Sequence, residues 1–101
     1  MHSQFRSYQL AVTFARDASR LSCPSHLKSQ LLRASSSVAL NLSEGVARPS
    51  ETDRRRYYVI AFGSLRESQT ILELVATCPV ALIQQADVLA ANLYRLCYPK
   101  R

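Results

Sequence analysis

The sequence is poor in the residues that mark disordered, membrane-spanning or fibrous proteins. It has 2 glycines, 4 prolines and no tryptophan in 101 residues, and 48% of its residues are hydrophobic. This composition excludes a low-complexity chain and predicts one globular domain over residues 1–101. No apolar run is long enough to cross a bilayer, and no signal peptide is recognisable. We therefore expect a cytoplasmic protein that does not act at a membrane.

Cysteine is also scarce, and its spacing excludes the common cysteine-based scaffolds. Cys23, Cys78 and Cys97 are odd in number and form no Cys-x-x-Cys motif. This pattern argues against a disulfide framework and a zinc module, and it fits a reducing compartment. His26 could join Cys23 and Cys78 around a metal ion, but three ligands at this spacing match no common zinc pattern. We predict no metal site and no cofactor, and the three thiols have no assigned role.

Acidic residues are outnumbered by basic ones. The chain has 7 Asp and Glu against 13 Lys and Arg, a net charge of +6 and a pI near 9.7. Such an excess in a small chain favours a polyanionic partner. No basic amphipathic helix carries bulky aromatic residues on its reverse face, so we favour nucleic acid over a membrane surface.

Strand-like alternation is absent, and the prolines separate segments with helical periodicity. We predict an all-α fold, an antiparallel up-down-up-down four-helix bundle with short connections. Ser50 has the properties of an N-cap, followed by acidic residues in the first helical turn. The predicted helices are Ser3–Arg20, Ser25–Ala47, Ser50–Thr77 and Pro79–Tyr98.

Apolar residues at three- and four-residue spacing mark the expected core face of each helix. In the first helix these residues are Phe5, Tyr8, Val12 and Ala15. In the second they are Leu27, Leu31, Ala34, Val38 and Leu42. In the third they are Tyr58, Ala61, Phe62, Leu65, Leu72 and Ala76. In the fourth they are Leu82, Ala86, Leu89, Leu93 and Leu96.

The stretch RASSSVALNLSEG, residues 33–45, is unusually polar for a helix. It could be a broken helix, a catalytic loop or a helix with polar residues along one edge. At about 100° per residue its polar residues gather beside the core face, which favours the third interpretation. We call this set and its expected partners on the third helix the polar seam: Arg33, Ser37, Asn41, Glu44, Ser64 and Glu67.

A hairpin that turns at Pro49 brings the two sides of the polar seam together. We predict an ion pair between Arg33 and Glu67 and a contact between Asn41 and Tyr57, because an unpaired charge on an inner face would be costly. A catalytic role is disfavoured, because His26 lies at the opposite end of the helix from Glu44 and no Ser-His-acid triad forms. We therefore expect a structural seam and a protein that is not an enzyme.

Two features of the sequence are not explained by the core of a single bundle, namely the positions of the two glycines and several apolar residues outside the expected core faces. Gly63 in the middle of a helix indicates close approach of another helix, whereas Gly45 fits either a C-terminal cap or a contact point. The apolar surface beyond the expected core indicates self-association. It comprises Leu32, Leu40, Ile60, Ile71, Leu74 and Val75.

In an up-down bundle the two termini and the turn between the second and third helices lie at one end. We call the cations expected there the basic end: Arg6, Arg48, Arg54, Arg55, Arg56, Arg95, Lys100 and Arg101. They could be a solvated helix start with local salt bridges, or a surface that contacts phosphates. Arginine suits phosphate through its fixed fork of donors, and binding would follow backbone or shape rather than base sequence.

The central hairpin, SQLLRASSSVALNLSEGVARPSETDRRRYYVIAFGSLRES, resembles the 23S rRNA-intervening sequence protein family of bacteria. Its motifs are Q-x-x-R-A, S-[IV]-x-x-N-[IL]-x-E-G, an R-x-S turn and A-x-G-S-x-x-E. The residues that carry them are Gln30, Arg33, Ala34, Ser37, Val38, Asn41, Leu42, Glu44, Gly45, Arg48, Ser50, Ala61, Gly63, Ser64 and Glu67.

The chain is also similar to the accessory variability determinant of diversity-generating retroelements. These resemblances imply a homopentameric, barrel-like assembly that binds RNA or DNA, with a reverse transcriptase as a further partner. The alternative is a protein-interaction module without a nucleic-acid role. The segment LSCPSHLKSQ, where the family has a Phe-Pro-x-x-Glu segment, departs from the family pattern.

Overall fold

The computed structural model describes residues 2–100, and the side chains of residues 3–100. The described chain forms four helices and no strand, so the predicted all-α fold is confirmed. None of these helices combines the length and apolar character needed to cross a membrane. The helices are α1 (His2–Ala18), α2 (Ser25–Val46), α3 (Glu51–Leu74) and α4 (Val80–Cys97).

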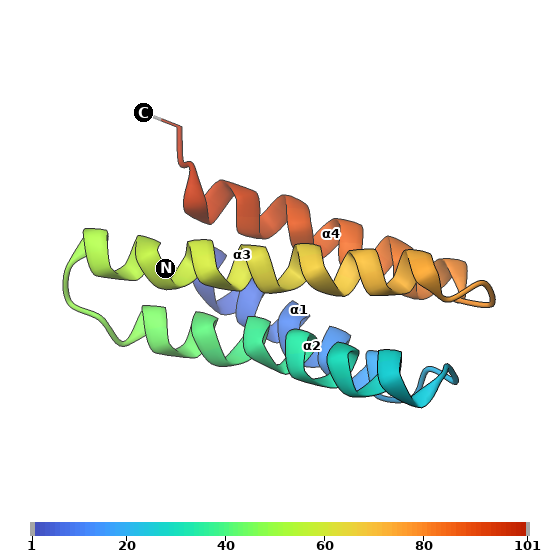
Figure 1. The fold of residues 1–101 in the computed structure, drawn as a ribbon. Helices are drawn as coiled ribbons and strands as arrows, with labels where there is room; N and C mark the ends of the chain where they lie inside the picture. Colours follow the sequence, from blue (N-terminus) through green and yellow to red (C-terminus); the bar gives the residue numbers. More distant parts are fainter. Residues whose placement is uncertain (1, 101) are drawn as a thin grey trace.

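Each helix packs against two others, and short loops join successive helices at alternating ends of an elongated molecule (Figure 1). The contacting pairs are α1–α2, α2–α3, α3–α4 and α1–α4. Within the described residues no direct contact joins the diagonal pairs. The four helices therefore surround one core, and the molecule measures 40 × 21 × 18 Å.

The helix ends follow local chemistry. Ser50 caps α3 as predicted, because its Oγ accepts a hydrogen bond of 3.1 Å from the backbone N–H of Asp53. Pro79 lies at the N-cap of α4 rather than inside its first turn. α3 ends at Leu74, three residues before the predicted Thr77. Val75 turns the chain there into an extended conformation that buries its own side chain.

The predicted core faces of α2 and α4 are confirmed almost residue for residue. Their fully or nearly fully buried members are Leu31, Ala34, Val38, Leu42, Leu82, Ala86, Leu89 and Leu93. On α3, Tyr58, Ala61, Leu65 and Leu72 are buried as expected and Phe62 is half-buried, whereas Ala76 lies beyond the end of α3 and is exposed. Ile71 and Val75, predicted to lie on surplus surface, belong to the core. The buried face of α3 is therefore broader than the spacing indicated.

The predicted core face of α1 is wrong. Phe5 is 62% exposed and Tyr8 is 37% exposed. Helical spacing alone fits two different stripes in this helix, and the one that is buried is made mainly of small residues. These allow the neighbouring helices to approach α1 closely, while one phenylalanine fills the centre. The buried stripe is Ser7, Ala11, Phe14 and Ala18.

Candidate nucleic-acid interface

The polar seam joins α2 to α3 through side chains at matching heights. The predicted ion pair between Arg33 and Glu67 is present, with 3.1 Å between Nη2 and Oε2. One turn away, the Oγ atoms of Ser37 and Ser64 lie 2.8 Å apart. From the first contact to the second, the residue number rises from 33 to 37 on α2 and falls from 67 to 64 on α3, so the two helices run in opposite directions. Two polar bridges therefore fix the register of this hairpin.

The charged residues of the polar seam lie on the outer surface, not on the inner face that we expected, whereas Ser37, Asn41 and Ser64 are half-buried. The side chains of Arg33 and Glu67 are 67% and 43% exposed. Asn41 donates to the backbone carbonyl and the Oγ of Ser37, at 2.9 and 3.0 Å, rather than reaching α3. In the described residues no hydrogen bond joins Asn41 to Tyr57, whose hydroxyl accepts from Arg48 instead. The ion pair therefore does not have to offset the cost of burying two charges, because both side chains are exposed to solvent.

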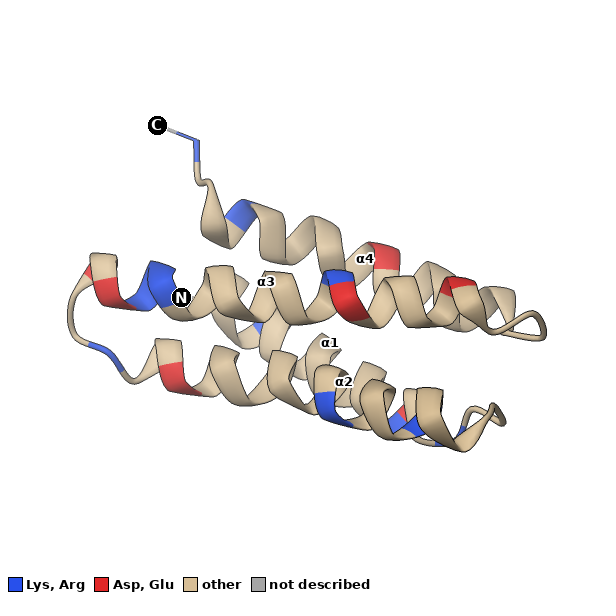
Figure 2. Ribbon diagram, viewed as in Figure 1, with Lys and Arg blue, Asp and Glu red and all other residues tan. Residues whose placement is uncertain are grey.

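The loop between α2 and α3, the start of α3 and the end of α4 lie at one end of the molecule and carry Lys and Arg residues (Figure 2). A stacking contact links two of these segments, because the guanidinium carbon of Arg55 lies 5.3 Å from the centre of the Tyr98 ring. Of the eight cations of the basic end, Arg101 lies outside the described residues.

Two arginines of the basic end have structural partners. Arg48 pairs with Glu44 one turn earlier and donates to the hydroxyl of Tyr57 at 3.3 Å. Tyr57 and Glu44 raise the pKa of the Arg48 guanidinium further, so this side chain stays charged. Arg54 donates from Nη1 to the backbone carbonyls of Arg48 and Pro49, both at 2.9 Å. These two arginines hold the loop between α2 and α3.

The other described cations of the basic end are exposed and make no ion pair within residues 3–100. Arg56 approaches Tyr57, with 5.9 Å between its guanidinium carbon and the ring centre, and Arg55 lies against Tyr98. Such stacking leaves the N–H edges of a guanidinium free to donate. The set that is free to meet an anion is Arg6, Arg55, Arg56, Arg95 and Lys100.

A row of aromatic rings, which we did not predict from the sequence, lines the groove between α3 and α4. The ring centres of Phe62 and Tyr94 are 6.2 Å apart, and those of Tyr94 and Tyr98 are 5.0 Å apart. Arg66 covers the outer end of the row at 4.8 Å from the Phe62 ring centre, and Arg55 covers the other end. The four-residue spacings Phe62–Arg66 and Tyr94–Tyr98 were the signal that could have revealed it.

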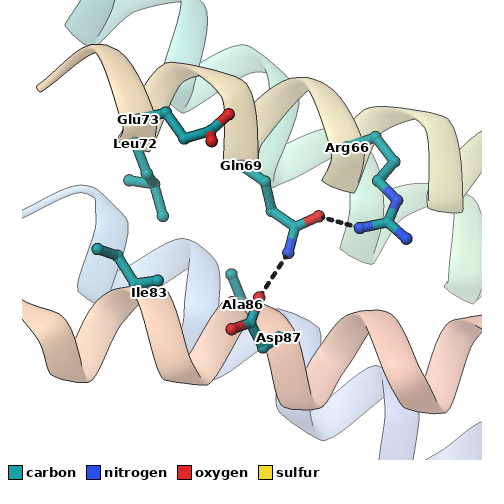
Figure 3. Close-up of a pocket in the computed structure, with 7 residues that line it drawn as sticks. All are labelled: Arg66, Gln69, Leu72, Glu73, Ile83, Ala86 and Asp87. Carbon is teal, nitrogen blue, oxygen red and sulfur yellow. Dashed lines mark hydrogen bonds between the residues drawn. The ribbon is translucent and has the colours of Figure 1, made fainter.

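An open hollow continues the same groove beyond Arg66 (Figure 3). Arg66 donates to Gln69 Oε1 at 2.7 Å, and Gln69 Nε2 donates to Asp87 Oδ1 at 3.1 Å. Buried Leu72 and Ala86 contribute its apolar lining. Glu73 and Ile83 complete the lining residues. Its two carboxylates make it a poor place for an anion.

The loops at the opposite end carry Cys23 and Cys78, both partly buried and both free thiols. Burial raises the pKa of the Cys78 thiol, and the neighbouring Cys23 raises it further. Cys97 lies in the core at the basic end, where burial raises its pKa and Arg55 partly offsets the increase. Residues 3–100 contain no group of three His, Cys, Asp or Glu side chains that could hold a metal ion.

The structure contradicts the expected close approach at Gly63 and decides between the two alternatives for Gly45. An added Cβ at Gly63 would meet nothing within 4 Å in the chain, so no helix of the same chain approaches it closely. A Cβ at Gly45 would lie 2.7 Å from Tyr58 Cε1 and 3.1 Å from Tyr57 Cβ. Gly45 is therefore the contact point, and it lets α3 approach α2 beside the basic end.

A comparison with curated proteins gives no match. A comparison with family models matches the 23S rRNA-intervening sequence protein model over residues 3–98. The match extends well beyond the central hairpin to α1 and α4. With its four-helix all-α fold, the chain belongs to the 23S rRNA-intervening sequence protein family.

Proposed function

We propose that this protein is a non-enzymatic scaffold that binds RNA or DNA through the basic end. The observation that carries the proposal is the exposed set of cations that make no ion pair within residues 3–100, contributed by α1, α3, the end of α4 and the residues after it. Phosphates are the anions that a nucleic acid presents densely, and their neutralisation releases condensed counterions. The family name refers to 23S rRNA, which agrees with RNA as one ligand.

Binding would follow the phosphate backbone rather than the base sequence. The free cations come from several elements and form a surface, not the row of side chains that a recognition helix inserts into a groove. Arg55 and Arg56 are consecutive residues of α3, so their side chains leave the helix about 100° apart and would contact different phosphates. We expect similar affinity for unrelated sequences at equal length and charge.

We also propose that antiparallel bundles associate into a homopentameric barrel, as the family resemblance implies. Large apolar side chains on α2 and α3 are exposed in the single chain, and Gly63 presents bare backbone beside them. Association would cover these residues and multiply the basic end. Light scattering after size exclusion tests this point, with five subunits as the expected mass. The exposed apolar set is Leu32, Leu40, Val59, Ile60 and Leu74.

A protein partner such as a reverse transcriptase is the second candidate function. The observation that favours it is the exposed Phe5 and Tyr8 of α1, which the bundle core does not use. Exposed aromatic residues are enriched at protein interfaces. In this case the charge would serve mainly solubility, and nucleic acid would not bind.

The deciding experiment compares two variants that lose the same charge at opposite ends of the bundle. Arg56→Gln/Arg95→Gln removes two free cations, whereas Arg16→Gln/Arg20→Gln removes two exposed cations at the far end of α1 and just after it, where Arg20 pairs with Asp17. We expect the first variant to bind a labelled oligonucleotide more weakly, with a log–log salt slope smaller by about two. The control should keep the wild-type affinity. Equal losses in both variants would contradict a localised site.

A further inference from the structure

In the row of rings between α3 and α4, Phe62 packs against the bundle core, whereas about half of each of the other two rings, Tyr94 and Tyr98, remains exposed. Tyr94 is 54% exposed and Tyr98 is 45% exposed, although tyrosine rings gain free energy by leaving water. Neither hydroxyl makes a hydrogen bond within residues 3–100. Exposed aromatic surface that is bordered by charged groups typically marks a binding site.

We propose that this row binds unpaired nucleic-acid bases by stacking, so that the protein prefers single strands to duplexes. The inference rests on the proposed nucleic-acid function and specifies its ligand. Every base offers an aromatic face, but in a duplex the neighbouring base pairs already cover it. Only an unpaired strand can place bases against Tyr94 and Tyr98 while its phosphates meet the cations beside them.

The charges along the groove complement such a strand. Arg55 lies against Tyr98, and Arg66 lies against Phe62, so cations border both ends of the aromatic row. Arg95 is exposed next to Tyr94 in the sequence, and Lys100 is exposed two residues after Tyr98. The rings would hold bases, and the arginines would meet the flanking phosphates or stack on a further base.

The same groove also indicates where the strand would end. Beyond Arg66 the hollow is lined by Glu73 and Asp87, whose carboxylates repel phosphate (Figure 3). Arg55 and Arg66 are eleven positions apart on one helix, which corresponds to about 16 Å at 1.5 Å per residue. At a rise of about 3.4 Å per nucleotide, that length corresponds to about five nucleotides. The groove therefore fits a short segment rather than a long track.

The test uses ligands that separate base stacking from charge. We would measure binding to a labelled oligothymidylate of about twelve nucleotides, to the same backbone with abasic sugars, and to a duplex of equal length. The intact strand and the abasic strand carry the same phosphates. We expect the wild-type protein to bind the intact strand at least about ten-fold more tightly than the abasic strand, because stacking contributes per base.

Variants then locate the stacking surface. Tyr94→Ala/Tyr98→Ala should bind the intact strand as weakly as the abasic one, with duplex binding and the salt slope unchanged. Tyr94→Phe/Tyr98→Phe keeps the rings and should retain the preference. Tyr8→Ala removes a partly exposed tyrosine from α1 and serves as the control. Circular dichroism and thermal unfolding verify that each variant is folded.

The outcomes distinguish this inference from the function on which it rests. If wild-type protein binds intact, abasic and duplex ligands equally, the stacking proposal is overturned while phosphate binding stands. The same holds if the alanine variant keeps the full preference for intact strands. If no ligand binds even at low salt, the proposed function itself fails, and the exposed rings then favour a protein partner.

Discussion

Arg33 on α2 and Glu67 on α3 are 34 residues apart in the sequence, yet their side chains form an ion pair of 3.1 Å. With the neighbouring contact between Ser37 and Ser64, this pair fixes how the two helices of the central hairpin are aligned. Both charges remain hydrated. The pair therefore specifies register more than it stabilises the fold, since exposed pairs contribute little net free energy.

Glu67→Gln should lower the free energy of unfolding by less than about 1 kcal/mol, because the pair is exposed to water. Urea unfolding of the wild type, Arg33→Gln, Glu67→Gln and the double variant gives the coupling between the two charges. We expect about 0.2–1 kcal/mol. A coupling well above this range would mean that the pair is buried, as it would be inside an assembly.

Substitution of the two glycines by alanine should have opposite effects. Gly45→Ala places a methyl group against Tyr58 and Tyr57, and such overpacking costs about 1–3 kcal/mol. Gly63→Ala adds a methyl group in open space and should stabilise α3 by up to about 1 kcal/mol. Thermal unfolding measures both changes. A destabilising Gly63→Ala that also lowers the subunit number would place Gly63 at a subunit interface.

Much of the fold can be predicted from hydrophobic periodicity, because α2 and α4 each have one continuous apolar stripe that becomes the buried face. The position of the turn at Pro49 was then enough to predict the partner of Arg33, because it determines which residues of α2 and α3 lie opposite each other. The prediction for α1 was wrong for a physical reason. Its aromatic stripe and its small-residue stripe both have helical spacing, so periodicity cannot tell which of them is buried. Only the packing of neighbouring helices selects Ala11 and Phe14 for the core and leaves Phe5 outside.

The candidate site was less predictable than the fold. Charge clustering identified the basic end, but sequence gave no means to separate the arginine that binds carbonyls, Arg54, from its neighbours Arg55 and Arg56. That difference depends on which side of α3 faces the loop. The ring row likewise needs Phe62 and Tyr94 from different helices, and their proximity is a property of tertiary packing.

Substitution of Arg54 should mainly lower stability, whereas substitution of the nearby Arg56 should mainly weaken nucleic-acid binding. Arg54→Ala removes a charged donor from two backbone carbonyls, and we expect it to lower the free energy of unfolding by about 1.5–3 kcal/mol. Arg56→Ala should change stability by less than about 0.5 kcal/mol, because its side chain is exposed. The same two variants in a binding assay should show the reverse order of effect per folded molecule. Equal destabilisation by both would contradict the structural assignment.

The bundle should lose stability in alkaline solution. Burial raises the pKa of the Cys97 thiol above its ordinary value of 9.0, with Arg55 partly offsetting this. Above that ordinary value the unfolded chain binds fewer protons than the folded chain, so the free energy of unfolding falls as pH rises. Burial raises the pKa of the Tyr58 hydroxyl and acts in the same direction.

Urea unfolding between about pH 7 and pH 10.5 measures this dependence. Cys97→Ala should be less stable at neutral pH, because it removes buried volume, yet its stability should fall less steeply above pH 9. Cys78 and Tyr58, whose pKa values burial also raises, leave a residual slope in that variant. Parallel curves for wild type and variant would show that the Cys97 thiol does not titrate differently in the folded chain.

The most direct test of nucleic-acid binding by the basic end is the salt dependence of affinity, measured by fluorescence anisotropy with a labelled duplex together with the binding stoichiometry. The basic end of one chain comprises eight cations, so a single subunit that binds through it allows a log–log slope no steeper than about −7 on a duplex. We predict a slope steeper than this, because several subunits of an assembly would contribute phosphate contacts together. Absence of binding at low salt, or an affinity that does not change with salt, would contradict the account.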